Sequence, residues 1–254
     1  MSDGEQMSEI RTTFHQQLDD IRRDLIRVAA RVVERITQGT EALLDLDLAA
    51  AQAIIEGDDE IDALTLDIED RCFTVLALQQ PMARDLRAVV TAIRLTSEIE
   101  RSADLMVNVA KATRRLYGAE IPAAVRGLLQ TMATEAARLY QVALEAYGQG
   151  DANLAGALDD MDDRLDQAHK DYVQVILGLD VDVQVAVQLA LVGRYYERIG
   201  DHAVNIGQRV QYMVTGWLPE HAGAARYAAR EAARREAVEA GGEADQDPEV
   251  DGNP

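Results

Sequence analysis

Several residue types are scarce in this chain of 254 residues, and each shortage excludes a class of protein. Cys72 is the only cysteine, so no internal disulfide and no cysteine-based zinc site can form. The polar, acidic N-terminus lacks the apolar segment of a secretory signal, and no stretch approaches the ~18 consecutive apolar residues that cross a membrane. These absences favour a location in the cytoplasm, with any membrane contact peripheral and made through partners.

Basic residues are also few. The chain has 25 Lys and Arg against 45 Asp and Glu, which gives a net charge of −20. That sign argues against nucleic acid or anionic lipid as the main partner, because both are bound through basic surfaces. Aromatic residues make up only 4% of a chain that is 48% hydrophobic, so we expect an aliphatic core.

Apolar residues recur at helical spacing along most of the chain, and prolines and glycines interrupt the pattern cleanly. Period-2 alternation is confined to residues 181–187, which continue into a helical segment and are interpreted as its first turns. The pattern predicts an all-α protein with six long helices, at roughly 8–44, 47–79, 82–117, 122–148, 151–178 and 181–215. Residues 217–254 form an acidic tail with too little apolar surface to order itself, so we expect it to be disordered.

The chain contains an internal repeat. Residues 57–62 match residues 161–166 at an offset of 104, and the same offset places Asp47 on Asp151, each a candidate N-cap. Residues 100–104 match residues 197–201 at an offset of 97. The difference of seven residues corresponds to about two helical turns. Removing a whole number of turns from paired helices shortens a bundle without changing which residues face each other. We therefore predict two tandem three-helix bundles, at 8–118 and 121–216.

Both repeats carry acids four residues apart, on what would be the second and third helices of each bundle. Residues at this spacing share a helix face, so each pair directs two carboxylates at one place. Four converging acids repel one another unless a cation lies among them, and oxygen ligands in this number suit Mg²⁺, Ca²⁺, Mn²⁺ or iron. The alternative is an acidic groove that is solvated or bound by a partner. The predicted metal ligands are Asp58, Asp62, Glu100 and Asp104 in the first repeat, and Asp162, Asp166, Glu197 and Asp201 in the second.

Histidine adds little to these clusters. Asp166 and His169 imitate half of the Glu-x-x-His motif of di-iron bundles, but Thr65 stands at the equivalent place in the first repeat, which makes oxidase chemistry a poor fit. His202 is expected either at the surface or as an extra ligand on one side. Arg101 and Arg198 are expected to pair with the Asp three residues on. No nucleophile arrangement or phosphate loop is present, so the chain is predicted not to be an enzyme.

Three segments of the chain resemble motifs of a known family. The segment Tyr-Tyr-Glu-Arg-Ile-Gly-Asp-His-Ala-Val-Asn-Ile at 195–206 resembles the signature of the PhoU family, bacterial accessory regulators of phosphate transport. Residues 98–111 are similar to its first-repeat copy, and residues 76–87 to the family's connection between second and third helices. The resemblance covers about residues 8–216. In the first repeat Ser102 and Ala103 replace an apolar residue and a glycine, so packing at that site is expected to differ.

The resemblance implies two three-helix bundles and metal clusters at the paired acids, holding iron, zinc, manganese or magnesium. It implies repression of the phosphate-starvation response through the ATPase subunit of a phosphate ABC transporter and a sensor histidine kinase, by a protein expected to be a homodimer. Two other classes of function stay open. One is a metal-dependent carboxylate-bundle enzyme or metal store, and the other is a structural helical scaffold.

Overall fold

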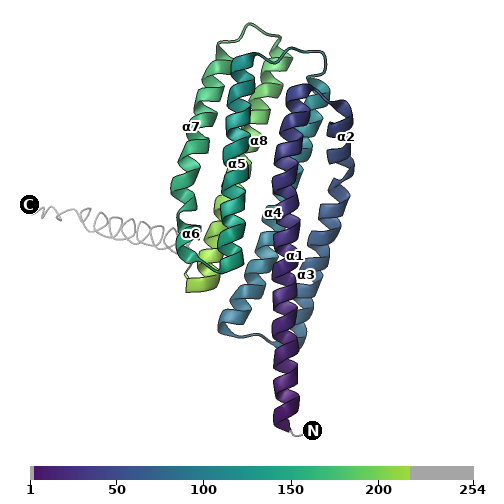
Figure 1. Ribbon diagram of the computed structural model, residues 1–254, viewed down its shortest axis with the longest axis vertical. Coiled ribbons are helices and arrows are strands. Elements are labelled where there is room, and N and C mark those ends of the chain that lie inside the picture. Colours follow the sequence, from purple (N-terminus) through teal and green to yellow (C-terminus); the bar gives the residue numbers. More distant parts are fainter. Residues whose placement is uncertain (1–2, 218–254) are drawn as a thin grey trace, which may run out of the picture. The chain divides into compact units, whose positions relative to one another are not determined.

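The computed structural model describes residues 3–217 of the chain, with side chains from residue 12 onward. No strand occurs in this range, which confirms the all-α prediction. The connections between helices are short (Figure 1). The helices are α1 (Asp3–Asp45), α2 (Leu48–Glu56), α3 (Asp58–Gln79), α4 (Ala83–Arg115), α5 (Ala123–Gln149), α6 (Ala152–Gly156), α7 (Leu158–Leu177) and α8 (Val183–Thr215).

The six expected helices are present, but two of them are interrupted. The second is divided at Gly57 into α2 and α3, and the fifth at Ala157 into α6 and α7. Both residues keep helical backbone angles, so each break is slight. The expected N-caps are confirmed: a side-chain oxygen of Asp47 accepts hydrogen bonds from two backbone amides at 2.9 and 3.0 Å, and Asp151 does the same at 2.9 and 3.1 Å.

The expected alternating segment at 181–187 contributes to α8 from Val183 onward. Asp182 caps the helix by accepting a hydrogen bond from the amide of Gln184 at 2.8 Å. The first two residues of the segment, Val181 and Asp182, precede the helix. A run of β-branched residues is therefore accommodated in a helix where a cap fixes its start and a long apolar face follows.

Within residues 3–216, α1, α3 and α4 pack together, and so do α5, α7 and α8. The two groups meet where α4 packs on α8 and α1 on α5. The turn after α3 and the turn after α7 lie at opposite ends of the helices (Figure 1). One apolar cluster runs through both groups and is mostly aliphatic, as expected. Its exceptions are a few fully buried tyrosines, of which Tyr196 on α8 shares a 2.7 Å hydrogen bond with Thr40 on α1.

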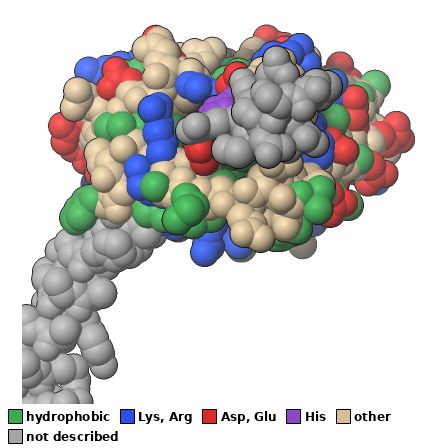
Figure 2. All heavy atoms as spheres, turned by 90° about the horizontal axis from the view of Figure 1, so that it is seen from below, with side chains coloured by type: hydrophobic (Ala, Val, Ile, Leu, Met, Phe, Trp, Pro, Cys, Tyr) green, Lys and Arg blue, Asp and Glu red, His purple; other side chains and the backbone are tan. Residues whose placement is uncertain are grey.

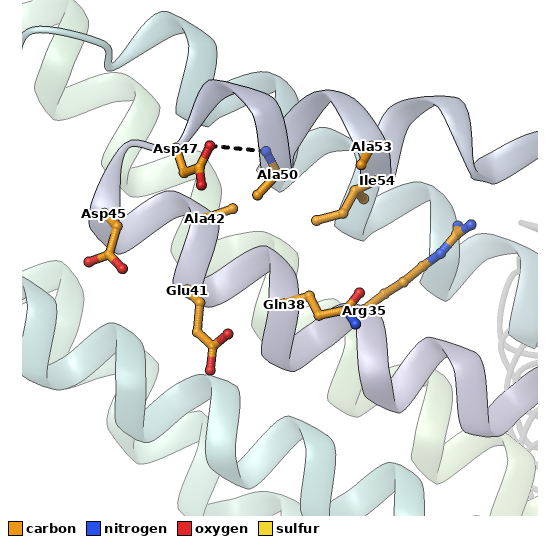
Figure 3. A pocket seen from close by; sticks show the side chains of 9 residues that line it. All are labelled: Arg35, Gln38, Glu41, Ala42, Asp45, Asp47, Ala50, Ala53 and Ile54. Carbon is orange, nitrogen blue, oxygen red and sulfur yellow. Dashed lines mark hydrogen bonds between the residues drawn. The ribbon is translucent and has the colours of Figure 1, made fainter.

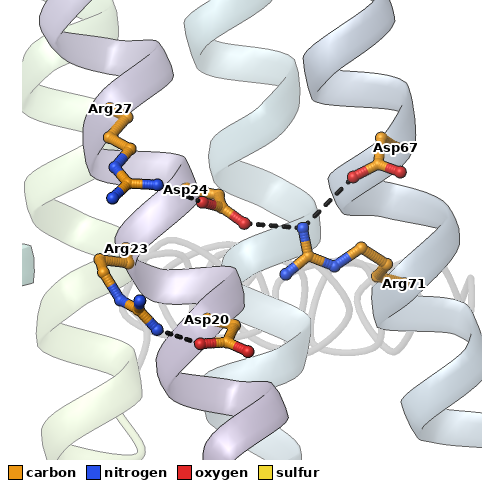
Figure 4. A network of polar contacts seen from close by, with 6 residues as sticks. All are labelled: Asp20, Arg23, Asp24, Arg27, Asp67 and Arg71. Atoms are coloured by element: carbon orange, nitrogen blue, oxygen red, sulfur yellow. Dashed lines mark hydrogen bonds and ion pairs between the residues drawn. The ribbon is translucent and has the colours of Figure 1, made fainter.

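Ion pairs tie α1 to α3 along their exposed side (Figure 4). One guanidinium nitrogen of Arg71 on α3 lies 2.7 Å from Asp24 on α1 and 3.2 Å from Asp67 on its own helix. Asp24 in turn pairs with Arg27. Because these side chains are partly solvated, each pair contributes no more than about 1 kcal/mol, but together they favour one register of α3 on α1.

Two arginines at equivalent places in the repeats bind the helix ends of the opposite group. Arg22 on α1 donates to the carbonyls of Tyr147 and Gly148 at the C-terminal end of α5, and Arg126 on α5 donates to the carbonyl of Leu44 at the end of α1. The last carbonyls of a helix have no partner within it and carry partial negative charge. Each half therefore caps a helix of the other.

The turn after α3 exposes apolar side chains. Leu78 is 72% exposed and Met82 81%. Figure 2 views the end of the molecule at which this turn lies, and on the face shown apolar, basic and acidic side chains are interspersed. No helix among the described residues is long and apolar enough to cross a membrane. The tail expected at 217–254 lies, apart from Trp217, outside the described residues.

Candidate functional site

The first set of predicted ligands comes from two helices that pack against each other. Asp58 and Asp62 lie in the first turns of α3, and Glu100 and Asp104 lie midway along α4. Burial, followed by the charges of Asp62 and Asp104, raises the pKa of Glu100. Burial and the neighbouring charge of Asp58 raise the pKa of Asp62 in the same way. These carboxylates are thus near enough to repel one another.

The second set is arranged likewise on α7 and α8. Burial, then the charges of Asp166, Asp201 and Glu197, raise the pKa of Asp162 to about 6. Burial and the charge of Asp201 also raise the pKa of Glu197. One oxygen of Asp162 (Oδ1) and one of Glu197 (Oε2) are buried without any hydrogen-bond partner. An unpartnered buried carboxylate oxygen is costly, and a cation or a proton would satisfy it.

Close packing of α7 on α8 explains why Asp162 is so enclosed. Gly200 on α8 faces α7, and a Cβ atom at this position would lie 2.7 Å from Asp162 Oδ1 and 2.5 Å from a methyl group of Leu165. Glycine lets the two backbones approach here. In the first repeat the equivalent residue is Ala103, which is fully buried on α4, so the expected difference in local packing begins at this position.

The first set contains a cation supplied by the protein, which the sequence analysis missed. Nη1 of Arg35 on α1 lies 2.8 Å from Asp58 Oδ1, and its Nη2 donates to the carbonyl of Gly57. The side chains of Arg35 and Asp58 are only 11% and 16% exposed. Despite this partner, burial still raises the pKa of Asp58. Arg101 and Arg198, which were expected to pair with the nearby aspartates, form no ion pair among the described residues.

The side chains of the two sets do not form a complete coordination sphere for a metal ion. Among the described residues, no three His, Cys, Asp or Glu side chains are positioned together as metal ligands. The arrangement fits a cation by its donor chemistry, by its accumulated negative charge and, in the second set, by its unpartnered buried oxygens. Carboxylate oxygens are the ligands that hard divalent and trivalent cations prefer. The metal site therefore stays a prediction.

The two histidines near the second set have different environments. His202 is buried, with a 7% exposed side chain, and does not lie at the surface. Its Nδ1 lies 2.7 Å from Glu98 on α4, and Asn205 donates to the same oxygen of Glu98 at 3.2 Å. Its Nε2 is buried without a partner. Burial lowers the pKa of His169, and Thr65, at the equivalent place, bonds only to backbone carbonyls of its own helix.

Sequence reasoning missed this Glu98–His202 contact because it joins the two halves of the chain. The repeat offset did carry a signal: Tyr195 stands where the first repeat has Glu98, and Leu105 stands where the second has His202. Both residues of the contact are thus replaced in the other repeat, and they lie on α4 and α8, the helices through which the two halves meet. This pattern indicates a contact between the halves that is formed once and not repeated. The contact fixes α4 against α8 beside both sets of acids.

Comparison with known proteins identifies the family. The model of the PhoU domain matches residues 25–113 and 129–210, one segment in each predicted bundle. The phosphate-specific transport system accessory protein PhoU homolog 1 of Mycobacterium bovis is 36% identical over 213 residues, which are 83% of this chain and 96% of that protein.

Two solved structures agree. The phosphate transport system regulatory protein PhoU of Streptococcus pneumoniae has a TM-score of 0.76 at 26% identity, over 81% of this chain and 98% of that one. PhoU of Pseudomonas aeruginosa has a TM-score of 0.75 at 27% identity, over 80% of this chain and 100% of that one. The chain belongs to the PhoU family, whose members are regulatory accessory proteins of phosphate transport and not enzymes.

Proposed function

We propose that this protein represses the phosphate-starvation response from the cytoplasm, as a metal-binding adaptor between the ATPase subunit of a phosphate ABC transporter and a sensor histidine kinase. The observation that carries the proposal is the match to the PhoU domain in both halves of the chain. The relatives that cover most of this chain are described as accessory proteins of the phosphate-specific transport system.

Surface chemistry supports an adaptor that acts through protein contacts. A net charge of −20 disfavours direct binding to a promoter. Cytoplasmic faces of membrane proteins are rich in Lys and Arg near the bilayer, and an acidic protein complements them. Exposed apolar side chains at the α3–α4 turn (Leu78, Met82) and at the α7–α8 turn (Leu177, Val183) add surface of the kind that interfaces use. The protein is proposed to act as a homodimer.

The two sets of carboxylates are proposed to hold the metal ions, which would be iron, zinc, manganese or magnesium. A bound ion supplies positive charge that relieves the repulsion among the acids. The chain contributes buried carboxylate oxygens from two packed helices, and in the second set two of these oxygens have no other partner.

Deletion of the gene tests the regulatory proposal. In high phosphate, we expect transcripts of phosphate-regulated genes to rise and phosphate uptake to increase, because the kinase is no longer restrained. Complementation with the unaltered chain should restore both. If transcripts and uptake stay at wild-type levels, and no second copy of the gene compensates, the protein is not a repressor of this response.

A double substitution tests the metal ligands. Glu197→Gln with Asp201→Asn keeps side-chain shape while removing charge, so we expect loss of metal from the second set and not from the first. The matched control is Asp160→Asn with Asp163→Asn, which removes the same charge from exposed positions of α7. Metal content is measured by elemental analysis of the purified proteins. Equal metal content in both double variants would show that Glu197 and Asp201 are not ligands.

A further inference from the structure

We propose that Arg35 is a built-in cation of the first carboxylate set, so that the two sets differ in affinity and the second, which has Leu139 at the equivalent position, takes up metal first. This inference rests on the proposed metal binding. It explains how residues of this chain give the two repeated carboxylate sets different affinities for metal. Three observations carry it: the contacts of Arg35, the residue that replaces it in the second repeat, and the state of one equivalent oxygen.

Arg35 reaches the first set from outside the two helices that carry its acids. It extends from α1 towards the helix that bears Ala53 and Ile54 (Figure 3), and its guanidinium binds Asp58 Oδ1 and the carbonyl of Gly57 at the α2–α3 junction. The guanidinium also stabilises the charged form of Asp62. A buried arginine bound to a carboxylate and a carbonyl is strongly held, since removing it would leave a buried charge without a partner.

Leu139 takes the place of Arg35 in the second repeat. The offset of 104 that relates Asp58 to Asp162, and the two end-capping arginines to each other, places Arg35 on Leu139. The structure agrees with this equivalence, because Leu139 and Asp162 both approach the same point, the position where a Cβ of Gly200 would lie. An apolar side chain therefore stands beside Asp162 where a guanidinium stands beside Asp58.

The consequence is visible in one pair of equivalent atoms. Asp58 Oδ1 is bound by Arg35, whereas Asp162 Oδ1 is buried without a partner. Among the described residues, the arginine that pairs with the second set is Arg194, which contacts Glu197 from the same helix; the Arg194 side chain is 50% exposed, whereas that of Glu197 is 13% exposed. In the second set Asp162 Oδ1 and Glu197 Oε2 are available to a metal while Arg194 stays on the other oxygen of Glu197. In the first set, coordination through Asp58 Oδ1 requires that Arg35 be displaced, and both side chains of that pair are largely buried.

Titration of the full chain with Mn²⁺ alone, with free Mn²⁺ measured by electron paramagnetic resonance, tests the inference. We expect two binding phases, with the weaker at least ~10-fold weaker because a buried ion pair must open. Glu197→Gln with Asp201→Asn should remove the tight phase, and Asp58→Asn with Asp62→Asn the weak one. Arg35→Leu, which copies Leu139, should strengthen the weak phase until the two merge. Circular dichroism checks folding, and Arg35→Gln serves if Arg35→Leu does not fold.

Arg31→Leu is the matched control. Arg31 lies one turn before Arg35 and pairs with Glu60 in an exposed contact, so its loss removes the same charge without freeing a predicted ligand. We expect it to leave both phases in place. One phase of equal affinity in the unaltered chain, or equal effects of the Arg35 and Arg31 variants, overturns the inference while the metal proposal stands. Binding that neither acid double variant reduces overturns the metal proposal, and this inference with it.

Discussion

Asp58 and Asp162 show how strongly a single neighbour changes a carboxylate in otherwise repeated surroundings. Burial raises the pKa of both, but Asp58 keeps a guanidinium against its oxygen, whereas Asp162 is faced by other acids. A group whose pKa in the folded protein exceeds its ordinary value stabilises the fold only while it is protonated. For Asp162 that contribution is complete below about pH 4 and is lost as the pH rises past about 6.

Asp162→Asn should therefore stabilise the metal-free protein at pH 7. We expect a gain of about 1 kcal/mol in the free energy of unfolding, less than the pKa shift alone would give, because solvent screens a partly exposed carboxyl. The gain should vanish near pH 4, where Asp162 is already protonated. Urea unfolding in the presence of a chelator measures it. Asp163→Asn, at an exposed neighbouring position, is the control, and an equal gain from that variant would contradict the explanation.

Cys72 is fully buried in the core. Burial raises the pKa of its thiol to about 12. The thiol therefore stays protonated at pH 8, and the thiolate is the reactive form. We expect the folded protein to react with a disulfide reagent orders of magnitude more slowly than the urea-unfolded protein. Similar rates in the two states would show that Cys72 is accessible.

At the scale of elements, glycines on α8 decide how closely the second repeat can pack. Gly193, Gly200 and Gly207 recur every seven residues along one face of α8, and a Cβ on each would lie 2.5 Å from a side chain of α7. The repeat offset places Thr96, Ala103 and Ala110 at these positions on α4. The first repeat therefore has side chains on α4 at the places where α8 has glycine.

Gly200→Ala should destabilise the protein and disturb the second carboxylate set. The added methyl group would overlap Asp162 and Leu165, which we expect to cost about 1–3 kcal/mol, as overpacking does in other cores. Thermal unfolding measures the loss. Gly127→Ala is the control, because nothing lies within 4 Å of a Cβ there, and its helical position favours alanine by about 0.5–1 kcal/mol. A neutral Gly200→Ala would mean that α7 and α8 separate easily.

At the scale of the whole described unit, residues 3–216, the two halves are held by contacts that cross between them. Arg22 and Arg126 cap helix ends in the opposite half, Thr40 meets Tyr196, and α4 packs along α8. Because these contacts join both halves to one continuous core, we expect residues 3–216 to unfold in one cooperative transition.

Arg22→Gln and Arg126→Gln should each lower the free energy of unfolding by about 1 kcal/mol, since each removes a charged donor from the C-terminal carbonyls of a helix. Arg23→Gln is the control, because Arg23 makes only an exposed pair with Asp20 and should change stability by less than about 0.5 kcal/mol. Urea unfolding measures all three. Separate transitions for the two halves in either capping variant would show that the arginines also provide the cooperativity.

The sequence by itself determined the features that depend on neighbours along the chain. Helical periodicity predicted the six helices, Asp47 and Asp151 marked two helix starts, and the repeat offsets predicted which acids occupy equivalent places. These predictions succeed because capping and helix faces involve residues within a few positions of each other. The family resemblance, carried by contiguous motifs at 98–111 and 195–206, is confirmed by the PhoU-domain match.

Only the tertiary structure decided which of the equivalent acids has a partner. Arg35 lies 23 residues before Asp58, and Glu98 lies 104 residues before His202, so neither contact follows from a periodic pattern. Both depend on how α1 and α8 pack beside α4 and on which side chains the packing encloses. The sequence repeats the acids in both halves, whereas the burial of one arginine in one half makes the two sets chemically different.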